Sequence, residues 1–364
     1  MTTEIYLVFP GRGTPRDTMA VSMVHKIVTG EPVSEIYLAD SSDDTMKVQA
    51  YIDKYIKTDG SLPWRPESLK LLLSYHYFKK HNLHELMDKY FGNKPPKIFV
   101  DSGAFSSMTL GSEINLESYI DWIKRYQDIM TIYANLDFIN DPVKTYENQK
   151  KMEDAGLKPI PVFHTGESIE WLQRYIDEGY TYICLGGMVP YSSDRKKLIT
   201  WISKCFNTAA ESGKPIKFHG FGMTSFDLMK AYPWASCDSS SWSTSFRFGN
   251  VHIFDEKKGR FQVVKFRDIK KSYKYAELLR SYGFSPNDIA IGSEIERIKV
   301  ATLSCMAFLK AEQWLNKRWK KYGANDKLSL WITPANQMGL DSANPEVHGM
   351  IDAAVMMNKG AQNE

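Results

Sequence analysis

The chain has 364 residues, a formal net charge of +3, 43% hydrophobic and 24% charged residues, a composition typical of a soluble globular protein. This length suits one large domain with an appendage, or two domains. The charge is too small to indicate a nucleic-acid partner by itself, and no apolar run reaches the roughly 20 residues that span a bilayer, so we expect no membrane partner. The first ten residues lack the basic start and long apolar stretch of a signal peptide, which favours a cytoplasmic location.

Short, apolar, β-rich runs recur along the chain and alternate with helical patterns. These runs do not alternate strictly between apolar and polar residues, as expected for parallel strands that are covered on both faces. The predicted strands are Glu4–Phe9, Glu35–Ala39, Lys97–Val100, Thr131–Leu136, Ile160–Phe163, Thr181–Leu185, Ile216–His219 and Trp234–Cys237. Eight strands with crossover helices over about 240 residues predict an α/β fold, a TIM (β/α)8 barrel.

Start and stop signals between the strands support this alternation. Asp141 and Pro142 provide a cap followed by proline at the first helical position, and Gly156 ends that helix. Ser168 is predicted to open the next helix, and Ser193 the one after it.

The spacing of the elements is uneven. We expect a barrel domain over residues 1–254 with a helical insertion at about 41–96, where helical patterns occur near Thr45–Lys57 and Pro66–Phe91. Residues 255–364 form a predicted C-terminal appendage, with a strand at Phe261–Phe266 and mostly helical segments up to about Tyr322.

Acidic residues follow three of the predicted strands directly. Asp101 comes after the third strand, Asp137 ends the fourth and Asp238 comes after the eighth. Active sites of barrels of this type lie at the C-terminal ends of the strands. Each aspartate taken singly could cap a helix or turn. Together the three aspartates favour a single acidic site, and pairs of glycines follow the sixth and seventh strands beside it. Charged side chains are rarely placed at such strand ends for stability alone, because burying an unpaired charge is costly.

A basic stretch near the C-terminus has two possible roles. It reads KAEQWLNKRWKKY over residues 310–322. It combines the basic residues Lys317, Arg318, Lys320 and Lys321 with the aromatic residues Trp314, Trp319 and Tyr322. Such a cluster suits phosphate contacts with base stacking, and it equally suits the solvated face of a helix.

The four cysteines show no metal-binding or disulfide pattern. They are Cys184, Cys205, Cys237 and Cys305, and none form a C-x-x-C pair. We expect buried free thiols and no metal site.

The strand-end motifs resemble those of the tRNA-guanine transglycosylases and their DNA-modifying relatives. Residues 100–105, VDSGAF, resemble that family's D-S-G-G-F/Y signature, and residues 185–188, LGGM, resemble its G-G-L/M element. Residues 219–222, HGFG, resemble its M-G-V-G turn, and Cys237-Asp238 resembles its F-D-C/S element. The resemblance covers roughly residues 99–254, with the motifs in the family's order.

The resemblance implies a base-exchange reaction through a covalent intermediate. Asp238 would attack C1′ of the target nucleoside, guanine would leave, and a 7-deazaguanine such as 7-cyano-7-deazaguanine would take its place. Asp101 would contact the base and act as general base for the incoming N9 proton. This chemistry is sound, since carboxylates are competent nucleophiles at oxocarbenium-like sugar carbons, and a second carboxylate can move the proton.

The resemblance also implies a base pocket and a phosphate contact. Asp137 would read the N1–H and amino edge of guanine, which offers two adjacent donors, Phe105 would stack on the base, and Gly187 would offer its amide to the exocyclic oxygen. His164 or Thr165 lies near the family's amide-bearing base reader, and His219 would shuttle a proton or pack over the base. The implied base-binding set is Asp137, Ser102, Phe105, His164, Thr165, Gly186, Gly187 and His219. Arg247 resembles an arginine that holds phosphate, and Lys317, Arg318, Lys320 and Lys321 would extend that nucleic-acid contact.

One departure shifts the expected substrate. The tRNA enzymes carry zinc on a C-x-C-x-x-C…H motif after the barrel, whereas Cys305 is the only cysteine after Asp238 in this chain, so we expect neither zinc nor another cofactor. The short N-terminal region, the helical insertion and the basic C-terminal helix resemble phage-type DNA-guanine transglycosylases, which favours DNA as partner and a host cytoplasm. The alternatives are a tRNA-guanine transglycosylase and a non-catalytic nucleic-acid-binding accessory subunit. The sequence is compatible with a homodimer.

Overall fold

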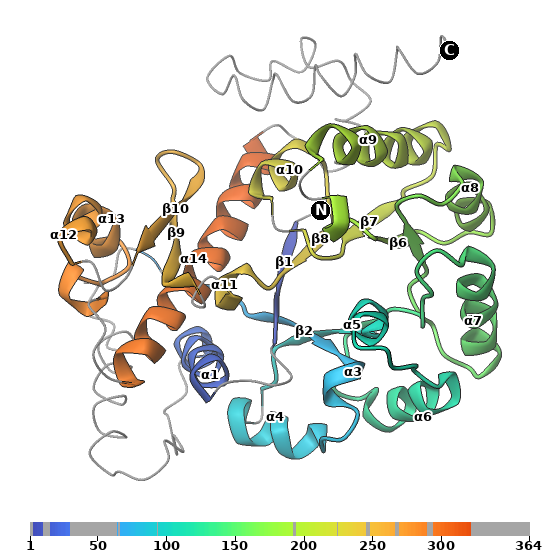
Figure 1. Cartoon of the computed structure of the whole chain (residues 1–364), viewed down its shortest axis with the longest axis horizontal. Helices are drawn as coiled ribbons and strands as arrows, with labels where there is room; N and C mark the ends of the chain where they lie inside the picture. Colours follow the sequence, from blue (N-terminus) through green and yellow to red (C-terminus); the bar gives the residue numbers. More distant parts are fainter. Residues whose placement is uncertain are drawn as a thin grey trace.

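The fold is α/β, built on an eight-stranded, all-parallel, curled sheet with helices on its outer face (Figure 1). The computed structural model describes residues 3–9, 15–29, 64, 66–92, 94–191, 194–223, 225–244, 248–265, 269–289 and 294–321. The strands are β1 (Glu4–Val8), β2 (Lys70–Ser74), β3 (Lys97–Asp101), β4 (Ile132–Tyr133), β5 (Val162–His164), β6 (Tyr182–Gly186), β7 (Lys217–Gly220) and β8 (Ser236–Ser239). Their order in the sheet is β4-β3-β2-β1-β8-β7-β6-β5.

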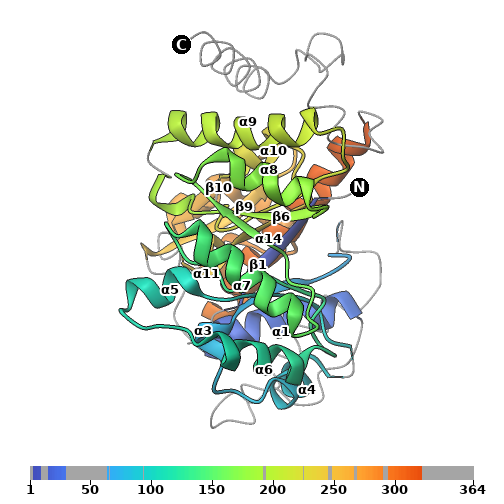
Figure 2. The same cartoon turned by 90° about the vertical axis from the view of Figure 1, so that its right-hand side faces the viewer.

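The helices follow the strands in the alternation that the sequence predicts. They are α1 (Pro15–Thr29), α3 (Tyr75–Phe78), α4 (Leu83–Phe91), α5 (Ala104–Thr109), α6 (Leu116–Tyr126), α7 (Pro142–Asp154), α8 (Ile169–Asp177), α9 (Arg195–Glu211), α10 (Phe226–Ala231) and α11 (Ser241–Thr244). Figure 2 shows α6, α7, α8 and α9 along one outer side of the sheet.

The predicted helix caps are confirmed where they are described, with one shift. Asp141 accepts a hydrogen bond from the Lys144 amide, and Ser168 caps α8. The cap of α9 is Asp194, whose side chain accepts from the Lys197 amide at 3.1 Å, whereas Ser193, predicted to open this helix, lies outside the described residues. A carboxylate at this position also complements the positive end of the helix dipole.

Two separate cores lie on the two faces of the sheet. The larger one fills the space between strands and helices. The smaller one lies inside the curl and contains Tyr6, Leu72, Phe99, Ala134, Ile160, Val162 and Cys184. Across this interior the rings of Phe99 on β3 and His219 on β7 are 4.4 Å apart, although four steps separate these strands in the sheet order. The sheet therefore curls until its inner side chains meet, as in a TIM-like barrel.

The two end strands of the sheet, β4 and β5, do not form a ladder with one another within the described residues. A single parallel bridge joins Ala134 to Ile160, with backbone hydrogen bonds from Asn135 N to Ile160 O (3.0 Å) and from Ile160 N to Tyr133 O (2.9 Å). The curled sheet is thus TIM-barrel-like, but within the described residues no continuous ladder between β4 and β5 closes it.

The predicted second strand is wrong in position. The place between β1 and β3 is taken by β2, whereas Glu35–Ala39 lies outside the described residues, as does the helical pattern at Thr45–Lys57. The helix predicted over Pro66–Phe91 is a strand, a short helix and then α4. The five residues of β2 are all buried, and its short apolar centre, Leu71–Leu73, fits a covered parallel strand and a buried helix equally well. The residues of β2 therefore belong to the sheet and not to the insertion predicted at about 41–96.

The C-terminal region begins with a hairpin. Strands β9 (Asn250–Asp255) and β10 (Arg260–Lys265) pair antiparallel, which confirms the strand predicted near residues 261–266 and crosses the predicted boundary at residue 254. Four short helical segments follow, namely α12 (Ile269–Ser272), η3 (Tyr273–Tyr275), α13 (Ala276–Arg280) and η4 (Pro286–Ile289), and then α14 (Glu294–Lys321).

Helix α14 is an integral part of the sheet's outer layer. It packs against α1, β1 and β9 (Figure 1). Glu312 of α14 forms a buried ion pair with Lys70 of β2 at 2.7 Å and accepts a hydrogen bond from the Ile5 amide of β1 at 2.5 Å. These partners of Glu312 lie more than 240 residues earlier in the chain, so α14 is joined to the sheet by long-range contacts.

No helix of the described part of the chain combines the length and the hydropathy needed to cross a bilayer.

Candidate active site

Three aspartates lie at the C-terminal ends of the strands, on the inner side of the curl. On β3, Phe99 belongs to the inner core and Asp101 follows two residues later, so the two side chains share a face. On β8, Cys237 is buried in the helix-facing core, which directs the neighbouring Asp238 to the interior. Cys237 and Asp238 therefore point to opposite faces of the sheet, and the thiol does not share the site of the carboxylate.

The carboxylates of Asp101, Asp137 and Asp238 are close enough to influence common groups. The pKa of the buried Cys184 thiol on β6 is raised well above its usual value by burial, and further by the negative charges of all three aspartates. The pKa of Asp101 is likewise raised by the negative charges of Asp137 and Asp238. The structure therefore brings together the three acidic residues that the sequence places after three different strands.

Asp101 holds a proton more tightly than an ordinary aspartate. Burial raises its pKa to about 7, and the charges of Asp137 and Asp238 add to this effect, while hydrogen bonds from the amides of Gly103 and Ser102 oppose it. A carboxyl group with a pKa near 7 can both give and take a proton under neutral conditions.

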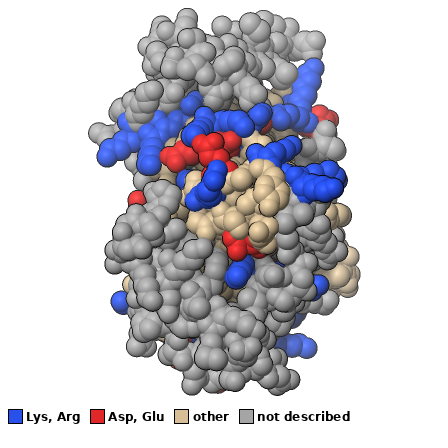
Figure 3. Space-filling view, turned by 90° about the vertical axis from the view of Figure 1, so that its left-hand side faces the viewer, with Lys and Arg blue, Asp and Glu red and all other residues tan. Residues whose placement is uncertain are grey.

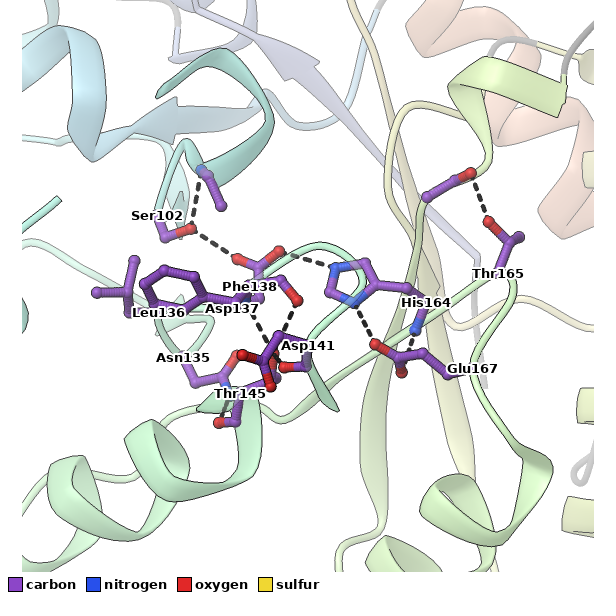
Figure 4. A network of polar contacts seen from close by, with 12 residues as sticks. Ser102, Asn135, Leu136, Asp137, Phe138, Asp141, Thr145, His164, Thr165 and Glu167 are labelled. Carbon is purple, nitrogen blue, oxygen red and sulfur yellow. Dashed lines mark hydrogen bonds and ion pairs between the residues drawn. The ribbon is translucent and has the colours of Figure 1, made fainter. Parts of the chain in front are cut away.

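Asp137 is fixed by hydrogen bonds to both of its carboxylate oxygens (Figure 4). The Ser102 hydroxyl donates to Oδ1 at 2.7 Å, and the His164 ring contacts Oδ2 through Nε2 at 2.9 Å. The other ring nitrogen of His164 contacts Glu167 at 3.0 Å, and the His164 amide donates to the same carboxylate at 2.9 Å. The His164 side chain is only 3% exposed, so the ring lies buried between two acids.

The pKa of His164 reflects this position. Burial lowers it, but the hydrogen bonds and charges of Asp137 and Glu167 outweigh burial and raise the pKa to about 9. His164 is therefore an imidazolium at neutral pH, and both of its N–H groups donate to carboxylates. Its ring stabilises the charge of Asp137 and sets the orientation of that carboxylate.

Asp238 is held by a backbone amide and faces a second histidine. The Gly222 amide, in the turn after β7, donates to Oδ1 at 2.8 Å. Nε2 of His219 lies 3.3 Å from the same oxygen. Within the described residues both polar contacts of Asp238 involve Oδ1.

His219 differs from His164 in its protonation. Burial is the main cause that lowers its pKa, with the nearby Asp238 carboxylate acting in the opposite direction. Its Nδ1 lies 2.5 Å from the Ser236 hydroxyl, which in turn contacts the Tyr182 hydroxyl at 2.5 Å. A neutral ring with its proton on Nε2 would accept from Ser236 and direct its N–H toward Asp238.

Two glycines are required by the geometry of the site. Gly103 has φ +79°, and a Cβ at this position would lie 2.4 Å from Ser74 Oγ. Gly187 has φ +72°, and a Cβ there would lie 2.6 Å from Thr165 Oγ1, whose hydroxyl donates to the Gly187 carbonyl at 2.7 Å. The glycines of the strand-end motifs thus allow backbone turns to approach one another closely.

A pocket of about 220 Å³ opens beside Asp137, between α5, the loop after it and the segment that follows β4. Its walls are mostly apolar and include Met108, Ile114, Leu136 and Phe138. Phe105, predicted to stack on a base, lies on α5 and is 41% exposed. An exposed aromatic ring and an apolar recess therefore flank the acidic cluster.

The predicted nucleic-acid contacts on α14 are only partly accessible. Lys317 and Lys320 are exposed and Arg318 is half-buried, whereas Arg247, Tyr322 and the side chain of Lys321 lie outside the described residues. Base stacking, one of the two roles that the sequence left open for this stretch, is contradicted for Trp319. Trp319 is buried, and Trp314 packs against Phe226, Phe254 and Gly259. The Trp314 ring packs α14 against the hairpin, and the buried Trp319 ring is not available to a ligand.

Sequence reasoning missed three polar partners of the site, namely Glu167, Ser236 and Tyr182. Glu167 could have been found, because it stands three residues after His164 in the turn that follows β5. Ser236 lies two residues before Asp238 and therefore shares its inner face. The role of Tyr182 depends on the pairing of β6 with β7, which local pattern does not reveal.

All four cysteines are buried free thiols, as predicted. No protein-family model matches this chain, and no curated protein matches it either.

Proposed function

We propose that this protein is a DNA-guanine transglycosylase that exchanges guanine in DNA for a 7-deazaguanine derivative. The observation that carries the proposal is the electrostatic coupling of Asp101 with Asp137 and Asp238 at the ends of three strands. In this proposal the curled sheet acts as a complete (β/α)8 barrel, with the reaction at its C-terminal mouth.

Asp238 is the nucleophile of the proposed reaction. Its Oδ2 attacks C1′ of an extruded deoxyguanosine, and the C1′–N9 bond breaks with its electron pair on guanine N9. The Gly222 amide and His219 hold Oδ1 and direct the other oxygen to the sugar. The product of this step is a glycosyl ester on Asp238, as in retaining glycosidases.

Asp101 moves the proton. With a pKa of about 7 it can protonate N9 of the leaving guanine and then accept the N9 proton of the incoming deazaguanine. The N9 of that base attacks C1′ and releases the Asp238 carboxylate. No cofactor is needed for this sequence of steps.

Asp137 recognises the base. Its carboxylate, fixed by Ser102 and His164, accepts hydrogen bonds from the N1–H and the 2-amino group of guanine. The adjacent pocket and Phe105 provide apolar surface for the ring faces. The absence of the C-x-C-x-x-C motif from the sequence favours DNA over tRNA as the substrate.

A base-exchange assay with radiolabelled guanine tests the proposal. Wild-type protein should incorporate label into duplex DNA, and Asp238→Asn should reduce incorporation by several orders of magnitude while it keeps the circular dichroism spectrum of the wild type. Asp141→Asn, which changes an exposed helix cap, is the matched control. Label found only in tRNA would support the tRNA enzyme, and binding without any exchange would support an accessory subunit. Release of free base without exchange would indicate a hydrolase.

A further inference from the structure

The segment between β8 and α14 carries a concentration of positive charge. Residues 256–283 contain nine Lys and Arg against three Asp and Glu, although the whole chain has a net charge of only +3. Figure 3 views the side on which α12, α13 and β10 lie in Figure 1, and shows Lys and Arg side chains around a small acidic group. The rest of the chain is therefore net acidic, and the positive charge is localised.

The tip of the hairpin is compensated by acidic neighbours. Lys257 pairs with Glu277 at 2.7 Å, and Lys258 pairs with Asp255 at 3.4 Å. The third acidic residue at the tip, Glu256, lies 4.0 Å from Lys310 and 3.6 Å from Lys317 of α14. Acidic side chains therefore offset the lysines at the tip, and the positive field is stronger at the opposite end of the hairpin.

That opposite end is the one connected to the candidate active site. Lys265 at the end of β10 is paired in register with Asn250, and β9 begins six residues after α11, which directly follows β8 and Asp238. Lys270 and Lys274 follow in α12 and η3, four residues apart and both exposed, so they lie on one side of these helical turns. Tyr273 stands beside them and is 57% exposed.

The other flank of the site is acidic. The loop after α5 and the start of α6 expose Glu113, Glu117 and Asp121, and residues 98–123 contain no Lys or Arg. A polyanion that reaches the three aspartates is repelled on this flank and attracted on the hairpin side.

We propose that Lys265, Lys270, Tyr273 and Lys274, here called the β10–α12 face, bind the phosphodiester backbone and stack on an unpaired base of a nucleic acid. Lysines contact the phosphates and the exposed tyrosine ring contacts a base, the combination used by proteins that hold single-stranded segments. The inference rests on the proposed function, since it supplies the surface that presents the extruded nucleotide to the aspartates.

The test is the salt dependence of binding, measured by fluorescence anisotropy with a labelled DNA duplex that contains an unpaired guanine. Joint replacement of Lys265, Lys270 and Lys274 by alanine should reduce the slope of log K against log salt by about 2–3, since each phosphate contact contributes roughly 0.9. Tyr273→Ala should weaken binding on the order of 10-fold at every salt concentration with no change of slope, because stacking releases no counterions.

A matched control removes the same charge elsewhere. Lys124, Lys158 and Lys217 are exposed and lie at the opposite end of the sheet, where the strands begin. Their joint replacement by alanine should leave the slope unchanged. If the salt slope falls equally in both triple variants, or does not fall in the Lys265, Lys270 and Lys274 variant, the β10–α12 face is not the binding surface.

Two additional measurements identify the type of nucleic acid that binds and distinguish this inference from the proposed function. The same titrations with an RNA stem–loop show whether the face prefers DNA or RNA, and a slope change with either supports it. Wild-type binding with this slope but without base exchange would remove the proposed function and keep the inference. Base exchange with an unchanged slope in the triple variant would remove the inference and keep the function.

Discussion

Nε2 of His164 lies 2.9 Å from Oδ2 of Asp137, and this contact joins the last residue of β5 to the segment that follows β4. The ring is also held by Glu167, so a buried cation stands between two carboxylates. Because a buried charge is costly unless it is paired, the His164 cation depends on these two carboxylates. The arrangement fixes the carboxylate that the proposal assigns to base recognition.

The buried imidazolium predicts a pH-dependent stability. The pKa of His164 is raised from 6.5 to about 9 in the folded state, so its contribution to the free energy of unfolding is full below pH 6.5 and is lost as the pH rises through 9. The loss amounts to about 3 kcal/mol at one pKa unit per 1.36 kcal/mol. Urea unfolding at pH 6 and pH 9.5 should show this difference for the wild type and a smaller one for His164→Gln. If the variant keeps the full pH difference, His164 is not the responsible group.

Asp101 predicts a pH profile for the exchange reaction. In its role as base for the incoming N9 proton it must be ionised, so kcat/KM for incorporation of the free base should rise as the pH passes through about 7. Asp101→Asn should lose exchange. A profile that stays flat between pH 5 and pH 9, with a chemical step that limits the rate, would contradict the assignment.

The same carboxyl group should lower stability when it ionises. Its pKa is raised above the ordinary 3.8, so the stability that it contributes is full below pH 3.8 and is lost by pH 7. Asp101→Asn should therefore be more stable than the wild type at pH 8, and the difference should shrink as the pH falls toward 4. Thermal unfolding of both proteins across this range measures it, and the opposite sign would show that Asp101 is stabilised as an anion.

Asp137 predicts selectivity for the amino edge of the base. Hypoxanthine keeps the N1–H of guanine but lacks the 2-amino donor. Asp137→Ala should therefore reduce the preference for guanine over hypoxanthine by about 10- to 100-fold, the effect of one hydrogen bond to a charged group. Competition between the two free bases in the exchange assay measures this ratio, with Asp141→Ala as control. An unchanged ratio together with a lower rate would assign Asp137 to the chemistry instead.

The buried pair Lys70–Glu312 predicts that α14 is essential to the fold. Glu312→Ala leaves Lys70 buried without its partner, and should lower the free energy of unfolding by about 3–5 kcal/mol. Glu277→Ala removes a pair of the same length whose side chains are 83% and 79% exposed, and should leave the free energy of unfolding nearly unchanged, because solvent screens an exposed pair. Urea unfolding compares the two variants. Equal effects would mean that α14 is dispensable.

The sequence by itself determined most strand positions, the helix caps at Asp141 and Ser168, and the strand ends that carry Asp101, Asp137 and Asp238. These features depend on local pattern, since apolar periodicity and capping act over a few residues. The tertiary structure decided that Lys70–Ser74 is the second strand, because an apolar run of this kind does not distinguish a covered strand from a buried helix.

Only the tertiary structure also decided what the charged residues pair with. Glu312 meets Lys70 across 242 positions of the chain, and His164 meets Asp137 across 27. A buried charge needs a partner because desolvation is costly. Which residue becomes that partner depends on the curl of the sheet, and no local pattern in the sequence predicts it. The acidic cluster was therefore predictable as a set of strand-end residues, whereas the protonation of His164 and the orientation of Asp137 required the fold.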